Sequence, residues 1–198
     1  MSGVDGGVLL RLDGLTAGYR QPVVGPLSLA LRRGERLGVW GPNGTGKSTL
    51  LKAIGHAAQV FAGRVERAPG LRVAYLDQQP VRLPAMPITG RELLRAAGAT
   101  TRGAPEALEA ILRRRIDRLS GGQYQLLWIW SALATDADLV LLDEPTNNLD
   151  PGRRDRLIEI LTTRHSDQAL ILVSHDRDFL QRTCSHLLDL ENGEVKHA

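Results

Sequence analysis

The chain has 198 residues, of which 25 are basic and 22 acidic, so its formal net charge is only +3. This length allows one domain with a sizeable core, and so small a charge gives no reason to expect a nucleic-acid or membrane partner. The single cysteine excludes an intrachain disulfide, and no run reaches the ~18 apolar residues of a membrane-spanning helix, so we expect a soluble, cytoplasmic protein without direct membrane insertion.

Short apolar strands are expected in the first part of the chain. Their alternating pattern and the Gly-containing turns between them predict strands at residues 8–12, 15–19, 26–31 and 37–40. The first of these alternates weakly, like an edge strand, and a turn at Asp13-Gly14 separates it from the second. We therefore predict antiparallel strands before a parallel core.

A glycine-rich segment follows the strand at 37–40 and fits the pattern G-x-x-x-x-G-K-[ST]. Its glycines let successive backbone N–H groups face a phosphate, Lys47 adds a charge for the β- and γ-phosphates, and the Ser48 hydroxyl is a ligand for Mg²⁺. A glycine-rich turn without a ligand is the alternative, but the strand before and the helical pattern at 50–54 after it favour phosphate binding. The expected nucleotide-binding residues are Gly41, Pro42, Asn43, Gly44, Thr45, Gly46, Lys47, Ser48 and Thr49.

The middle of the chain changes from strands to helices. Strands are predicted at residues 63–66 and 71–76, and the second of them ends just before Gln78. Helical spacing of apolar residues then predicts helices at 91–95 and 105–118. We interpret the region from about 85 to 134 as a small helical subdomain.

The last third of the chain alternates helices with continuous apolar strands. The pattern predicts a helix at 124–134, a strand at 139–145, a helix after the cap Asp150 and a strand at 169–174, followed by a terminal hairpin with an Asn192-Gly193 turn. Continuous apolar strands alternating with helices indicate an α/β fold whose parallel sheet is covered on both faces.

Polar residues follow the apolar strands in an order that suits nucleoside triphosphate hydrolysis. In an open parallel sheet, ligands bind at the carboxyl ends of the strands. There Asp143 would hold Mg²⁺, Glu144 would orient or deprotonate the attacking water, and Gln78 and His175 would contact the γ-phosphate side. Taken alone, Asp143 and Glu144 could be acids at the start of a helix, Gln78 a surface amide and His175 an ordinary loop histidine. Their order after a phosphate loop favours a hydrolytic site.

These motifs together make the chain resemble the nucleotide-binding domain of ATP-binding cassette (ABC) ATPases over its whole length. The signature of that family is matched by Leu119 to Gln123, its Q-loop by Gln78, its D-loop by residues 148–150 and its switch histidine by His175. The resemblance implies a P-loop NTPase core with an antiparallel β subdomain and a short α-helical subdomain, as a single domain over 1–198. It also places Tyr19 where an aromatic ring stacks on adenine.

The resemblance further implies how such a domain works. Two domains pair head to tail, so ATP on one phosphate loop is closed by the signature of the other subunit, here Ser120, Gly121, Gly122 and Gln123. ATP and Mg²⁺ are the implied cofactors, with Ser48, Gln78 and Asp143 as metal ligands. A chain with one such domain is expected to form a homodimer or to pair with another ABC chain.

The helix after the signature departs from the family pattern. Leu126 and Ser131 stand where arginines are usual, which puts the rate of hydrolysis in question. Trp128 and Trp130 are two positions apart and cannot share one face of a helix. We expect one of them in the core.

Two functions are compatible with these motifs. The segment from Gln78 to Arg95 is similar to the metal-ion importer branch, which predicts an ATPase subunit bound to a membrane permease at the inner face of the cell membrane. Residues 144–150 and 174–180 are similar to ABC-F-type soluble factors, which act on ribosomes and would add nucleic acid as a partner. Because such factors carry two cassettes and a charged linker in one chain, we favour the transporter subunit.

Overall fold

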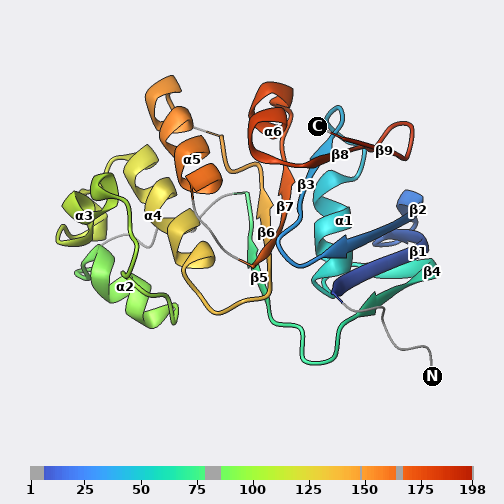
Figure 1. Ribbon diagram of the computed structural model, residues 1–198, viewed down its shortest axis with the longest axis horizontal. Helices are drawn as coiled ribbons and strands as arrows, with labels where there is room; N and C mark the ends of the chain where they lie inside the picture. The colour runs from blue at the N-terminus through green and yellow to red at the C-terminus, as the bar shows by residue number, and fades with distance from the viewer. Residues whose placement is uncertain (1–6, 79–85, 148, 164–166, 198) are drawn as a thin grey trace.

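The computed structural model describes residues 7–78, 86–147, 149–163 and 167–197 (Figure 1). Its strands form two sheets. The three-stranded sheet has the order β2-β1-β4 and the six-stranded sheet the order β5-β6-β7-β3-β8-β9. The strands are β1 (Val8–Gly18), β2 (Pro22–Arg32), β3 (Arg36–Trp40), β4 (Gln59–Arg67), β5 (Val73–Leu76), β6 (Leu139–Asp143), β7 (Ala169–Val173), β8 (His186–Asp189) and β9 (Glu194–His197).

The antiparallel sheet corrects the expectation of an edge strand at residues 8–12. That segment belongs to β1, which pairs with β2 on one side and β4 on the other and is therefore the central strand. Asp13-Gly14 is not a turn between two strands: β1 continues through Gly14, which has φ 58° and lies where the register shifts. A β-bulge of this kind bends a strand without ending it.

The six-stranded sheet has the predicted parallel core. In the order in which they lie in the sheet, the neighbouring strands β5, β6, β7, β3 and β8 are parallel. β9 returns antiparallel to β8 as the expected terminal hairpin. Alternate residues of β6 face opposite sides: Val140 and Leu142 pack with the helices, whereas Leu139 and Leu141 pack toward the three-stranded sheet. Both faces of this sheet are therefore covered, as continuous apolar strands require.

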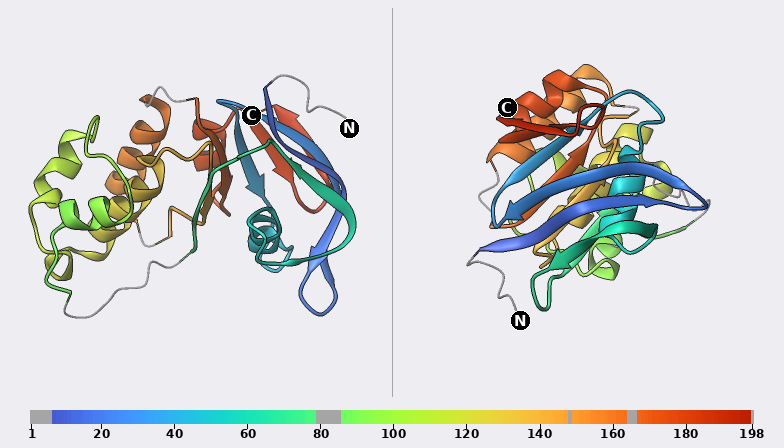
Figure 2. Two further views of the ribbon diagram at one scale, coloured as in Figure 1. Left: turned by 90° about the horizontal axis from the view of Figure 1, so that it is seen from below. Right: turned by 90° about the vertical axis from the view of Figure 1, so that its right-hand side faces the viewer.

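The helices separate into two groups. Helices α2 to α6 pack in the core on one face of the six-stranded sheet, and α1 lies on the other face beside the three-stranded sheet (Figures 1 and 2). They are α1 (Lys47–Ile54), α2 (Gly90–Ala96), α3 (Glu106–Leu112), α4 (Gly121–Leu133), α5 (Pro151–Thr163) and α6 (Arg177–Thr183), with a 3₁₀ turn η1 (Ile116–Arg118). No helix of the described chain combines the length and the apolar character that a bilayer span requires.

The predicted helix at 105–118 is shorter than expected. It ends at Leu112, and the chain then pairs with the start of α2: Ile116 N–H donates to the Ile88 carbonyl at 2.9 Å, and Gly90 N–H donates to the Arg114 carbonyl at 3.0 Å. Ile116 still reaches the core. The predicted burial of Ile116 is therefore confirmed, but its backbone pairing with Ile88 places it outside the helix.

The two tryptophans of α4 lie on different faces, as predicted. Trp130 is buried and its indole N–H donates to the Thr100 carbonyl at 3.3 Å, whereas half-buried Trp128 stacks on Tyr124 with the ring centroids 6.1 Å apart. Leu126 and Ser131 are also buried, and the Ser131 hydroxyl donates to the Trp128 carbonyl at 2.6 Å. Arginine side chains at these two positions would have to be accommodated inside this packing.

Candidate active site at the carboxyl ends of the central strands

The phosphate loop joins the end of β3 to the start of α1 (Figure 1). Gly46 caps α1 with φ 94°, and a Cβ there would lie 2.8 Å from the Val24 Cβ of β2. Glycine is therefore required both by the backbone conformation and by the close approach of β2. The loop keeps the amino end of α1 open, where backbone N–H groups bind anions.

Lys47 folds back over the loop that it follows. Its ammonium donates to the Gly41 and Pro42 carbonyls, each at 2.8 Å, and its side chain is buried. No salt bridge to a described carboxylate neutralises it. An ammonium held only by neutral carbonyls in a buried position is prepared for an anionic ligand.

Asp143 ends β6 with a carboxylate that is only 3% exposed. Neither of its oxygens has a hydrogen-bond partner among the described residues, although the Ser48 hydroxyl lies near enough to affect its pKa, and burial together with the Asp143 charge raises the pKa of the Tyr75 hydroxyl. Burial raises the pKa of Asp143, the Ser48 hydroxyl opposes that rise, and the charges of Asp77 and Glu144 add to it. Buried unpaired carboxylate oxygens next to a serine hydroxyl fit a hard cation such as Mg²⁺.

Glu144 follows directly and is held by its backbone and its side chain. Its φ is 49°, in the left-handed region, which costs a non-glycine residue about 1 kcal/mol or more. Its N–H donates to the Val173 carbonyl at 2.9 Å, and its buried carboxylate accepts from His175 Nδ1 at 2.9 Å. The residue after β6 thus combines a left-handed backbone with a carboxylate that contacts the histidine after β7.

His175 is the exposed member of that pair, with 62% of its side chain accessible against 7% for Glu144. The residues around it are fixed: Ser174 is fully buried, its hydroxyl accepts from Asp176 N–H at 3.1 Å, and it lies 3.2 Å from the Thr146 hydroxyl. Since a carboxylate only accepts, the 2.9 Å contact with Glu144 assigns the proton to Nδ1 of His175.

One open pocket of about 360 Å³ gathers most of the phosphate loop together with Gln78 and Glu144, whereas Asp143 and His175 are not among its described lining residues. Gln78 reaches it from the end of β5, although the residues after it, 79–85, lie outside the described chain. Val23 also lines the pocket, although it was not among the predicted residues: it is an exposed apolar side chain near the start of β2, and its local sequence carries no signal of function. The lining residues are Val23, Asn43, Gly44, Gly46, Lys47, Ser48, Thr49, Gln78 and Glu144.

Tyr19 and the signature lie outside this pocket. Tyr19 is half exposed at the end of β1 and is not one of the described lining residues. Ser120 caps α4, across the six-stranded sheet from α1, in a capping box with Gln123 (Figure 1). Gly121 is exposed, and a Cβ on Gly122 would come within 2.6 Å of the Arg153 side chain.

The predicted D-loop is described in part. Asn148 lies outside the described residues, whereas Asp150 caps α5 as predicted, its carboxylate accepting from Arg153 N–H at 2.9 Å. Arg153 also pairs with Asp150 through its guanidinium. The first turn of α5 therefore joins this loop to the signature glycine Gly122 through one arginine.

Comparison with known proteins agrees with these motifs. Residues 24–147 match the family described as ABC transporter. A zinc import ATP-binding protein of Paracoccus denitrificans is 39% identical over 186 residues, which are 88% of this chain and 71% of that protein. The ATP-binding protein Uup of Caulobacter vibrioides is 35% identical over 96% of this chain, which spans 33% of that longer protein.

Solved structures show the same fold. An ATP-binding subunit of an ABC transporter superposes with a TM-score of 0.76 at 27% identity, covering 96% of this chain and 90% of that one. A metal-chelate type ABC transporter in an inward-facing conformation gives a TM-score of 0.75 at 24% identity, covering 96% and 83% of the two chains. The second likeness supports the fold alone.

Proposed function

The chain belongs to the ABC transporter family of ATP-hydrolysing proteins, and from that premise we propose that it powers a membrane permease for metal ions as a head-to-tail dimer. In this proposal residues 1–198 act as one ATPase domain at the inner face of the membrane. Its helical part, approximately residues 85–134, faces the permease.

The observation that carries the hydrolytic role is the contact between His175 and Glu144, which lines the phosphate-loop pocket. Oε2 of Glu144 is engaged by the His175 ring and, at 3.4 Å, by the His175 backbone N–H. Oε1 is then the oxygen that accepts a proton from water. A buried carboxylate with one oxygen fixed in this way suits a general base.

The reaction transfers a phosphoryl group to water. The water oxygen forms a bond to the γ-phosphorus as the bond to the β–γ bridging oxygen breaks, and the water proton goes to Glu144. Lys47 exchanges its carbonyl contacts for phosphate oxygens and stabilises the charge. Ser48, Asp143 and Gln78 would hold Mg²⁺, which supplies further charge stabilisation when bound.

Support for a metal-ion permease comes from relatives. Besides the Paracoccus protein, zinc import ATP-binding proteins of Marinobacter nauticus and Ruegeria pomeroyi are 32% and 35% identical to this chain. The importer-like segment from Gln78 to Arg95 is described only in part, because residues 79–85 lie outside the described chain. A pull-down from cells tests the partner: a co-purifying permease supports the proposal, and co-purifying ribosomes would replace it with the ABC-F-type role.

Replacing Glu144 with Gln tests the hydrolytic role. We expect ATP hydrolysis to fall at least ~100-fold because the base is lost, while ATP binding persists and an ATP-bound dimer accumulates on size exclusion. Glu159→Gln is the matched control, since Glu159 is an exposed acid of α5 paired with Arg156. A Glu144→Gln protein that hydrolyses ATP as a monomer would contradict the proposal.

A further inference from the structure

The segment that carries His175 is held by an arginine from a different helix. Arg154 lies in the first turn of α5, where its N–H donates to the Asp150 carbonyl at 2.9 Å. Its guanidinium reaches across to the start of α6 and donates to Asp176 and to Asp178, each at 2.6 Å. A planar guanidinium binds two carboxylates at fixed positions, which a lysine ammonium does not.

Asp176 follows His175 directly, and its two carboxylate oxygens accept hydrogen bonds from different groups. Its Oδ1 accepts from Phe179 N–H at 3.0 Å and so caps α6, while its Oδ2 receives Arg154. Its own N–H is bound by the Ser174 hydroxyl. The backbone on both sides of His175 is therefore fixed by groups outside the catalytic pair.

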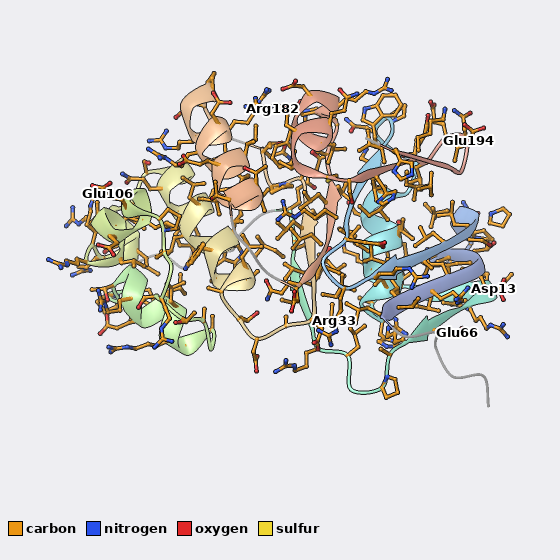
Figure 3. All side chains as sticks on the ribbon, viewed as in Figure 1. Asp13, Arg33, Glu66, Glu106, Arg182 and Glu194 are labelled. Carbon is orange, nitrogen blue, oxygen red and sulfur yellow. The ribbon has the colours of Figure 1, made fainter. Side chains whose placement is uncertain are left out.

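This contact is not explained by stability alone. The Arg154 side chain is 32% exposed and that of Asp176 is 20% exposed, so the pair is partly desolvated. The Nε atom of Arg154 is buried without a hydrogen-bond partner among the described residues, which opposes folding. Arg182, labelled on α6 in Figure 3, makes ordinary exposed contacts nearby, with Asp155 at 3.2 Å and Asp178 at 3.7 Å, and no ion pair between described residues joins it to Asp176.

We propose that Arg154 is a positioning residue for hydrolysis: through Asp176 it sets the His175 ring against Glu144. This inference rests on the proposed role of Glu144 and His175. A histidine with 62% of its side chain exposed has few packing contacts to hold its rotamer. The direction of its ring therefore depends on the position of its backbone. The first turn of α5, which Asp150 caps, also carries Arg153, whose side chain lies close to the signature glycine Gly122. The same turn would therefore set the orientation of His175 and contact the signature.

The test compares Arg154→Gln with Arg182→Gln in the full chain. Both changes remove one positive charge from the contact between α5 and α6, but only the first releases Asp176. We expect Arg154→Gln to lower kcat about 10-fold with KM for ATP within about twofold, because geometry is lost but the phosphate loop is untouched. Arg182→Gln is expected to keep wild-type kcat.

Two further variants separate positioning from loss of fold. Asp176→Asn keeps the Oδ1 cap but places an amide NH₂ against Arg154, so it should lower kcat as Arg154→Gln does, and the double variant should fall no further. Arg154→Lys should restore part of kcat, since it keeps one charged contact. The midpoint temperature of thermal unfolding of Arg154→Gln should lie close to that of Arg182→Gln.

Equal kcat values for Arg154→Gln and Arg182→Gln would overturn the inference, and so would additive losses in the double variant. Glu144→Gln is assayed alongside. If it keeps its activity, the proposed function has failed; if it loses activity while Arg154→Gln does not, only the positioning role has failed.

Discussion

Asp143 carries a carboxylate that the fold buries without a hydrogen bond from any described residue. Its neighbour Glu144 is held in a left-handed backbone conformation. Each feature opposes folding, and each lies where the proposed chemistry needs it, in one case for a cation and in the other for a base. Individual residues of the site thus trade stability for function.

Replacing Asp143 with Asn should stabilise the nucleotide-free protein. Burial raises the pKa of Asp143, so the folded protein binds this proton more tightly than the unfolded chain does. The stability linked to that proton is present below the ordinary Asp range of about 3.9 and is lost as pH rises through the raised value. At neutral pH the free energy of unfolding of the variant, measured by chemical denaturation, should be about 1 kcal/mol higher. The variant should also lose Mg²⁺-dependent ATP binding.

Asp138, at the other end of β6, is the matched control. Its pKa is lowered, first by the backbone N–H of Arg72 and then by the guanidinium groups of Arg33 and Arg72. That stability is present above the ordinary Asp range and is lost as pH falls, so Asp138→Asn should destabilise the protein at neutral pH. If both variants shift stability in the same direction, the assigned environment of Asp143 is wrong.

Among the elements, β1 depends on a close approach of β4 at its bulge. A Cβ added to Gly63 would lie 2.3 Å from the Gly14 backbone, whereas one added to Gly70 meets no atom within 4 Å. The two glycines have nearly equal φ values, 70° and 72°. Gly70→Ala should therefore cost about 1 kcal/mol of backbone strain, and Gly63→Ala roughly 3 kcal/mol or more because the backbones must also separate.

Thermal or denaturant unfolding of the two variants measures this difference. The comparison removes the shared cost of a positive φ and leaves the steric term alone. Equal losses would mean that the bulge at Gly14 relaxes without cost.

The sequence predicted elements whose signal is local. The phosphate loop, the Asp150 cap and the continuous apolar strand that becomes β6 each depend on a few consecutive residues, and the structure has them. The early end of α3 and the central place of β1 depend on partners far along the chain, so spacing alone misjudged them. The contact between Glu144 and His175 joins residues 31 positions apart, and only the folded sheet brings them together.

On the scale of the whole molecule, the phosphate loop and the signature belong to different parts of the fold. The loop leads into α1 on one face of the six-stranded sheet, and Ser120 to Gln123 open α4 on the other (Figures 1 and 2). None of the described signature residues lines the phosphate-loop pocket. In the proposed head-to-tail dimer, the phosphate loop of each chain would therefore meet the signature of the other chain.

Mixing two inactive variants tests that arrangement. One carries Lys47→Ala and keeps its signature; the other carries Gly121→Asp and keeps its phosphate loop. Gly121 is exposed and a Cβ there meets nothing within 4 Å, so aspartate should leave the fold intact and only repel a triphosphate bound by the partner. Both are made in the Glu144→Gln background, where closed dimers persist.

Each variant alone has two defective sites and should stay monomeric with ATP on size exclusion. In the mixed dimer, one site joins the intact phosphate loop of the Gly121→Asp chain to the intact signature of the Lys47→Ala chain, and the other site joins both defects. The mixture should therefore form dimers that retain one ATP each, and Gly121→Ala, the control for size without charge, should dimerise alone. A mixture that stays monomeric, or a Gly121→Asp protein that dimerises alone, would refute a site shared between two chains.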